Sequence, residues 1–152
     1  MLMPINFKNW IKQNRHLLKP PVGNKMVYEN TEMMIMVVGG PNTRKDYHID
    51  EGEEFFYQLE GDMILRIMEN GKPKNVSINE GDIFLLPPKI PHSPQRFENT
   101  VGLVIERKRR DGELDGFQWY CDGCNSLLHE VFFTLTDIEK QLPLIFDGFW
   151  AN

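Results

Sequence analysis

Two stretches of this chain combine histidine, glutamate, glycine and proline in a regular order. Residues 44–61 read RKDYHIDEGEEFFYQLEG, and residues 80–96 read EGDIFLLPPKIPHSPQR. In each stretch, a short apolar run of the kind that forms a strand stands beside a tight turn rich in glycine, proline or acidic residues. Glu54 opens the first run, and a proline-stiffened turn separates the second run from His92. Both stretches therefore predict strands that hold a potential ligand at one end.

Similar short runs, rich in β-branched and aromatic residues, fill the chain outward from these two stretches. Glycine, proline and asparagine clusters separate them. Many short strands in one domain indicate an antiparallel sandwich or barrel rather than alternating strands and helices. We therefore predict a mainly β fold, a single jelly-roll barrel, with strands at 33–38, 55–59, 63–68, 75–78, 83–86, 101–107, 117–120 and 129–136.

A helix is expected at each end of the chain. Residues Asn6 to Leu18 have amphipathic helical spacing, and the proline-rich segment 19–24 ends that helix. A short helix is expected to begin in segment 137–142, with Thr136 or Asp137 as its N-cap. The predicted organisation is one domain over 1–152: N-terminal helix and loop (1–24), barrel (25–120) and C-terminal extension (121–152).

Composition narrows the class of protein. Of 152 residues, 41% are hydrophobic and 26% charged, which is typical of a globular domain, and the net charge is −5. This charge argues against nucleic acid or an anionic membrane as the main partner. The basic run 107–110 is interpreted as a solvated loop. The two cysteines and the absence of a signal-peptide core or a 20-residue apolar stretch predict a cytoplasmic location.

The two opening stretches bring together a set of potential metal ligands. His48 precedes a tight turn, Glu54 follows it, and His92 ends the second stretch. Two imidazoles and one carboxylate can form a facial triad that leaves coordination positions open, an arrangement suited to iron(II) and oxygen chemistry. Each residue alone could instead be an ordinary surface or turn residue. The glycine and proline spacing around all three favours the metal site.

These motifs resemble those of the cupins. Segment 40–61 resembles the first cupin motif, with a metal histidine, a glutamate and a glycine seven residues later. Segment 81–92 resembles the second motif, with a proline six residues after its glycine and a final histidine. Many cupins carry His-x-His in the first motif, where this chain has His48-Ile49-Asp50. The difference leaves a three-ligand site and favours iron dioxygenases over four-ligand cupins.

A narrower resemblance covers nearly the whole chain, from about Phe7 to Trp150. The chain resembles the 3-hydroxyanthranilate 3,4-dioxygenase family in segments that generic cupins do not share, namely LKPPVGN (18–24), HSPQR (92–96), VIER (104–107) and WYCDGC (119–124). The resemblance implies an oxidoreductase with one catalytic Fe(II) per chain. It would open the ring of 3-hydroxyanthranilate with both atoms of O2, giving 2-amino-3-carboxymuconate semialdehyde on the kynurenine route to quinolinate and NAD. A homodimer is also implied.

The same resemblance suggests roles for four further residues. Arg96 would bind the substrate carboxylate through its guanidinium fork, and Arg44 would orient the phenolic oxygen or O2. Glu106 would meet the substrate amine and take part in proton transfer, and Asn24 would lie on a closing loop. The alternatives are that the arginines only balance the acidic loop around residues 50–54, and that Glu106 pairs with Arg107.

Cys121 and Cys124 resemble half of a rubredoxin-like second metal site found in microbial members of the family. A second Cys-x-x-Cys pair is not found before the chain ends at Asn152, and two thiolates do not complete a tetrahedral site. His129 is a candidate third ligand, and a plain turn between strands is the alternative. Two alternatives remain: a C-terminal tail with the second pair is missing from this sequence, or the structural second metal is absent. Rival functions are another aromatic dioxygenase, a non-catalytic sensor of an aromatic ligand, or a structural cupin.

Overall fold

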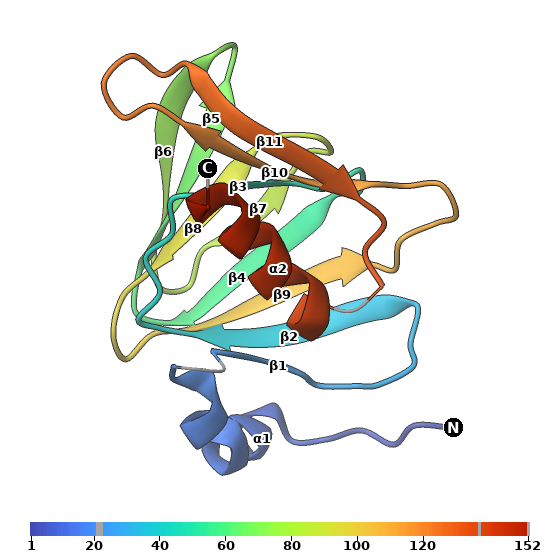
Figure 1. The fold of residues 1–152 in the computed structure, drawn as a ribbon. Helices are drawn as coiled ribbons and strands as arrows, with labels where there is room; N and C mark the ends of the chain where they lie inside the picture. The colour runs from blue at the N-terminus through green and yellow to red at the C-terminus, as the bar shows by residue number, and fades with distance from the viewer. Residues whose placement is uncertain (21–22, 137, 152) are drawn as a thin grey trace.

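The computed structural model describes residues 1–20, 23–136 and 138–151. Strands dominate, with one helix near each end of the chain (Figure 1). The elements are α1 (Phe7–Asn14), a 3₁₀ turn η1 (Arg15–Leu18), β1 (Asn24–Met26), β2 (Met33–Gly39), β3 (Tyr47–Ile49), β4 (Glu54–Glu60), β5 (Met63–Glu69), β6 (Lys72–Ile78), β7 (Ile83–Leu86), β8 (His92–Arg96), β9 (Val101–Arg107), β10 (Asp115–Tyr120), β11 (Leu127–Phe133) and α2 (Ile138–Trp150).

The strands form two antiparallel sheets. One has the order β1-β2-β9-β4-β7 and the other the order β11-β10-β3-β8-β5-β6. Neighbouring strands are often far apart in sequence, as in the pairing of β2 with β9 over seven residues. This topology confirms the predicted mainly β, jelly-roll class. All eight predicted strands are present, but three further strands, β1, β3 and β8, were not predicted.

Alternating side chains explain how the sheets bury a core. A cluster of buried residues contains Phe56 of β4, Leu65 of β5, Leu86 of β7 and Val104 of β9, drawn from both sheets. These residues lie on the inner faces because successive strand side chains point to opposite sides. The tight β4–β5 connection needs Gly61, whose φ of +71° is disfavoured for other residues.

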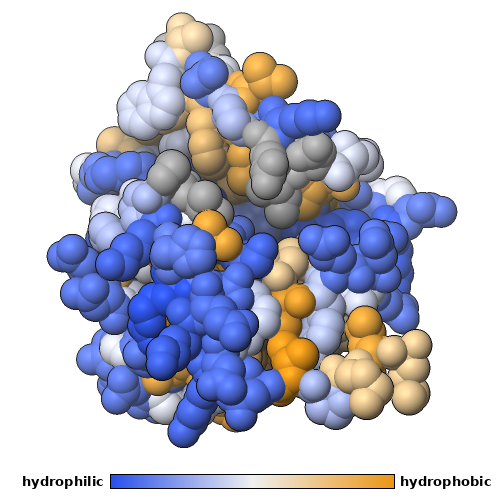
Figure 2. Space-filling view, turned by 90° about the horizontal axis from the view of Figure 1, so that it is seen from below, coloured by the Kyte–Doolittle hydropathy of each residue, from blue (hydrophilic) through white to orange (hydrophobic). Residues whose placement is uncertain are grey.

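The N-terminal helix packs on the sheet that carries β1. Its N-cap is Asn6, whose side chain accepts from the Asn9 backbone N–H at 3.0 Å. Ile11 of α1 and Leu18 of η1 form a second buried cluster with Val37. The view from below, the side of α1 in Figure 1, is mostly hydrophilic with a narrow hydrophobic band (Figure 2). Of the predicted helix, α1 forms the first part and the 3₁₀ turn the remainder.

The C-terminal helix is longer than the short helix expected, because it continues through Pro143 to Trp150. Aromatic contacts with β10 explain its extent. Phe149 stacks on Trp119 with ring centroids 4.5 Å apart, and Phe146 meets Phe117 edge-on at 5.3 Å. Asp137, one of the two predicted N-caps, lies outside the described residues. No helix in the described ranges is both long and apolar enough to cross a membrane.

Candidate functional site

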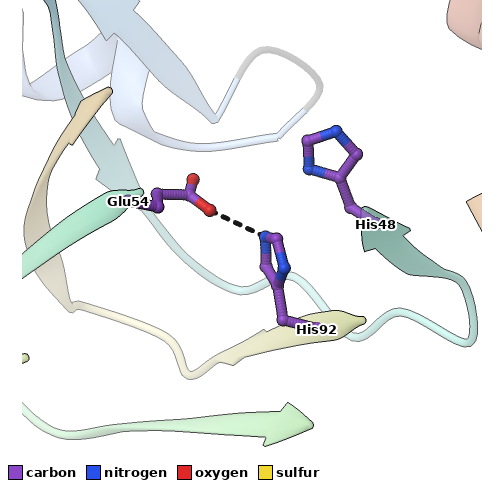
Figure 3. Close-up of side chains that lie close together, drawn as sticks. All are labelled: His48, Glu54 and His92. Carbon is purple, nitrogen blue, oxygen red and sulfur yellow. Dashed lines mark ion pairs between the residues drawn. The ribbon is translucent and has the colours of Figure 1, made fainter. Parts of the chain in front are cut away.

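Strand register brings the three predicted metal ligands together. His48 of β3 is the direct partner of His92 of β8, and their ring centroids are 5.2 Å apart. Glu54, the first residue of β4, lies in the facing sheet, with Oε2 2.7 Å from His92 Nε2 (Figure 3). Potential ligand atoms of all three residues lie within 4.8 Å of one another. The two sheets therefore bring two imidazoles and a carboxylate to one point.

The chemistry of these donors fits a cation. His92 Nδ1 donates to the Ile90 carbonyl at 2.9 Å, so a neutral ring presents its Nε2 lone pair towards Glu54. Glu54 Oε2 is buried and has no hydrogen-bond partner of acceptable geometry. Burial raises the pKa of Glu54, but the His92 and His48 side chains more than offset this, and the pKa falls to about 2. A buried carboxylate beside two imidazoles needs a positive charge, which a protonated imidazole or a bound metal ion can supply.

The three residues adjoin a cavity of about 300 Å³, at the small end of the range for ligand pockets. His48 and Glu54 line it, and its apolar walls include Phe56, Val104 and Phe117. Leu142 of α2 also contributes, so the C-terminal helix forms part of the wall. The remaining polar residues that line the cavity are Asn24, Asn42, Arg44, Arg96, Glu106, Arg109 and Asp115.

Arg96 lies on β8, on the same face as His92 four residues earlier. It is 3% exposed, and its Nη1 donates to Gln58 Oε1 at 3.5 Å. The guanidinium lies over Gly102 of β9, where a Cβ atom would come within 2.5 Å of Nη1. Burial lowers the pKa of Arg96 to about 10, with Glu54 acting in the opposite direction, so the group stays charged at neutral pH.

Glu106 is the cross-strand partner of Glu54 in the β4–β9 pairing, so both carboxylates face the cavity. Burial and the Glu54 charge raise the pKa of Glu106 to about 8, although Arg109 acts to lower it. The proposed alternative pairing with Arg107 is wrong. Glu106 forms an ion pair with Arg109, and Arg107 binds Glu113 with both Nη atoms at 2.6 Å.

Arg44 and Asn24 also line this cavity, but they are more exposed to solvent than Arg96 and Glu106. The Arg44 guanidinium is partly exposed and pairs with Asp46. Its backbone carbonyl accepts from Gln95 Nε2 at 2.9 Å, which ties this loop to β8. Asn24 is the first residue of β1 and is exposed. Both side chains can therefore reach a bound ligand from the cavity's edge.

The interpretation of segment 107–110 as a solvated loop is wrong for Arg107, which ends β9 and pairs with Glu113, and for Arg109. The side chain of Arg109 is only 11% exposed and pairs with three carboxylates. One of these, Asp115 of β10, also lies 2.6 Å from His48 Nε2. Sequence reasoning missed Arg109, Asp115 and Gln58 as site residues. The basic run around Arg109 did not indicate burial, although Glu106 and Asp115 are only three and six residues away.

Cys121 and Cys124 lie in the turn between β10 and β11, and both are free. The turn is closed by the Asn125 N–H, which donates to the Cys121 carbonyl at 2.9 Å. Hydrogen bonds with Ser126 lower the pKa of Cys124. The ring of His129 packs instead on Trp119, at 5.5 Å. Within the described residues, the only group of three or more potential ligands is His48, Glu54 and His92.

Comparison with known proteins identifies the sequence family to which this site belongs. The model of the family described as 3-hydroxyanthranilic acid dioxygenase matches residues 1–150. A 3-hydroxyanthranilate 3,4-dioxygenase of Xanthomonas campestris pv. campestris (strain B100) is 53% identical over 152 residues, which is 100% of this chain and 86% of the relative. The enzyme of the same name from Jannaschia sp. (strain CCS1) is 55% identical, covering 99% of this chain and 84% of its own length.

Solved structures support the fold. A cupin-2 domain containing protein from Shewanella frigidimarina superposes with a TM-score of 0.53 at 16% identity, over 69% of this chain and 94% of that protein. At this identity the likeness concerns the cupin fold alone. Fold and sequence family thus agree on one architecture, with the His48, Glu54 and His92 cluster in its interior.

Proposed function

The chain belongs to the 3-hydroxyanthranilic acid dioxygenase family, and on that premise we propose that it opens the ring of 3-hydroxyanthranilate with O2. The product is 2-amino-3-carboxymuconate semialdehyde, whose atoms are the sum of substrate and O2, so no further oxidant or reductant is needed. Iron(II) held by His48, Glu54 and His92 is the proposed cofactor. When bound, it supplies the redox-active centre through which the ring and O2 exchange electrons.

The observation that carries the proposal is the distribution of charge around the cavity. A buried cation, Arg96, and a buried carboxylate, Glu106, border the same small cavity as the three-residue cluster. The substrate carries a carboxylate, an amine and a hydroxyl on adjacent ring carbons. The buried guanidinium matches the substrate carboxylate, the buried carboxyl group of Glu106 can hydrogen-bond with the amine, and the metal site remains for the hydroxyl side.

Each residue then has a defined task. Arg96 holds the carboxylate with two parallel N–H donors, which fixes the ring plane as a single ammonium could not. Glu106 accepts a hydrogen bond from the amine and can hold a proton released there, because its pKa is raised to about 8. Arg44 stabilises negative charge that develops at the cavity's edge, and Asn24 contacts the substrate from β1.

The apolar walls complete the site by excluding water. Phe56 and Val104 come from the core between the sheets, and an aromatic ring fits against them. Exclusion of water strengthens the ion pair that Arg96 makes with the substrate carboxylate and the hydrogen bond between Glu106 and the amine. The proposal also includes a cytoplasmic homodimer that supplies quinolinate, and hence NAD synthesis, on the kynurenine route. Family resemblance is the support for these wider roles.

Metal content tests the ligand assignment. His48→Ala, Glu54→Ala and His92→Ala should each lose bound iron and O2 consumption while keeping a β-rich circular dichroism spectrum. Cys124→Ala is the matched control, because Cys124 is exposed and lies outside the cavity; it should retain iron and turnover. If all three triad variants retained iron, the assignment would be refuted.

Substrate analogues separate this function from its rivals. 2-Aminophenol lacks the carboxylate that Arg96 is proposed to bind, and 3-hydroxybenzoate lacks the amine. Both should have much lower kcat/KM than 3-hydroxyanthranilate. Faster turnover of another phenol would identify a different aromatic dioxygenase. Tight binding of 3-hydroxyanthranilate to the iron-loaded protein without O2 consumption would indicate a sensor.

A further inference from the structure

Arg109 lies at the centre of an acidic cluster next to the proposed active site. Its Nε and Nη2 donate to the two oxygens of Asp115 at 2.8 and 2.6 Å, a two-point fork. Nη1 donates to Glu106, and Nη2 lies 3.4 Å from Asp50 Oδ2. All three carboxylates are at least 90% buried. One guanidinium thus joins Glu106 of β9 and Asp115 of β10, three and six residues away, to the more distant Asp50.

Asp115 connects this cluster to the metal site. The oxygen that accepts from Arg109 Nη2 also lies 2.6 Å from His48 Nε2. A neutral imidazole that donates one N–H to a carboxylate keeps its lone pair on the other nitrogen, so such a contact selects both tautomer and ring orientation. The ring of Phe117, stacked on His48 at 5.1 Å, restricts the remaining freedom.

Glu106 connects the same guanidinium to the substrate side. It faces Glu54 across the β4–β9 pairing, so two buried carboxylates are adjacent there. Without a nearby cation, these two carboxylates would repel and Glu106 would turn away. The Arg109 ion pair holds Glu106 in place.

We propose that Arg109 is a positioning residue that orients His48 through Asp115 and holds Glu106 towards the substrate. It acts through these two partners. The inference rests on the proposed function, because it assumes a metal at His48 and an amine at Glu106. A purely structural salt bridge would affect the stability of the fold but would leave metal affinity unchanged.

Arg107 offers a matched control for this distinction. It lies two residues away and binds Glu113 with a similar fork, both distances being 2.6 Å. Its pair is more exposed to solvent and does not border the cavity. Arg107→Lys and Arg109→Lys therefore make the same chemical change in the same segment, and only the second reaches the site.

The experiment is a titration of the metal-free protein with Co(II), followed by its visible absorption. Arg109→Lys and Asp115→Asn should each bind Co(II) about 10- to 100-fold more weakly than the wild type, the usual cost of removing an outer-sphere partner. The double variant should lose little more than either single variant, because both act on His48. Arg107→Lys should bind Co(II) as the wild type does. At saturating iron, Arg109→Lys should also raise KM for 3-hydroxyanthranilate.

Circular dichroism and thermal melting establish that each variant is folded before the titration. If Arg109→Lys does not fold, the near-isosteric Asp115→Asn tests the same link. Wild-type Co(II) affinity in Asp115→Asn, or an unchanged KM in folded Arg109→Lys, would overturn the proposal. The Co(II) titration needs no turnover, so a failure of the proposed ring opening would appear separately, as a wild-type protein that binds metal but consumes no O2.

Discussion

Gly102 is the position at which the smallest change should do the most damage to substrate binding. In Gly102→Ala, the new Cβ would lie 2.5 Å from Arg96 Nη1 and 2.7 Å from Gln58 Oε1. The φ angle is outside the left-handed region, so the backbone accepts alanine without strain. Both clashing atoms are ends of long side chains, which can move more easily than β9 can. The substitution should therefore displace the Arg96 guanidinium and leave the fold intact.

The size of the effect follows from the distances. Optimal contacts between non-bonded heavy atoms are about 3.5 Å or longer, so Nη1 must move by about 1 Å. A 1 Å misplacement of a substrate-positioning group can cost about 100-fold in rate. The charged hydrogen bond alone is worth about 1.5–3 kcal/mol, or about 10- to 150-fold. We expect kcat/KM for 3-hydroxyanthranilate to fall by about 10- to 100-fold.

The assay is initial-rate O2 consumption by iron-loaded protein over a range of substrate concentrations, with iron content measured in each sample. Gly123→Ala is the control, because its added Cβ meets only Cys121 Sγ, at an ordinary 3.8 Å. It should retain wild-type kcat/KM. A folded, iron-replete Gly102→Ala with unchanged kcat/KM would show that Arg96 does not bind the carboxylate.

Three further predictions concern the metal, the C-terminal helix and acid stability. Removing the metal with a chelator should abolish O2 consumption, and Fe(II) but not Zn(II) should restore it, as a spectrophotometric activity assay can check. Phe149→Ala should destabilise the protein by about 1–2 kcal/mol in urea unfolding, because it removes partly buried area and the stack on Trp119; an unchanged midpoint would contradict the role given to this contact. Although burial raises the pKa of Asp115, contacts with His48 and Arg109 bring it down from 3.8 to about 2. A lowered carboxyl pKa stabilises the fold above the unfolded-state pKa, so about 2 kcal/mol should be lost between pH 4 and pH 2 in the metal-free protein. Asp115→Asn should lack this pH dependence.

The local sequence pattern was enough to predict the long strands, but not the short strands β1, β3 and β8. The seven-residue strands β2, β4 and β9 have sequences in which apolar residues alternate with polar ones or form a continuous run. In the structure these residues alternate between more and less buried positions. The strand β8 reads HSPQR and β3 has three residues, so neither has a recognisable hydrophobic period. They are strands because they pair with each other and with β10 and β5. These two unpredicted strands carry both histidines of the triad and Arg96.

The residues of the site divide in the same way between local sequence signals and contacts that only the fold creates. The spacing of His48, Glu54 and His92 is a local signal, since glycine and proline turns set where each side chain stands. The buried role of Arg109 depends on contacts between strands, and four consecutive basic residues normally indicate a solvated segment. Glu106 and Asp115 lie within ten residues of one another, but it is the fold of β9, β10 and the segment between them that turns both carboxylates towards the same guanidinium. The charges were visible in the sequence, and their burial was not.

The most direct test of the account is the stoichiometry of a single turnover. Protein loaded anaerobically with one Fe(II) per chain would receive one equivalent of 3-hydroxyanthranilate and then ¹⁸O-labelled O2. One O2 should be consumed per substrate, the semialdehyde absorbance should grow, and both labelled atoms should appear in the ring-opened product. Bound iron with no O2 consumed, or O2 consumed with release of hydrogen peroxide and an intact ring, would contradict the proposed ring opening.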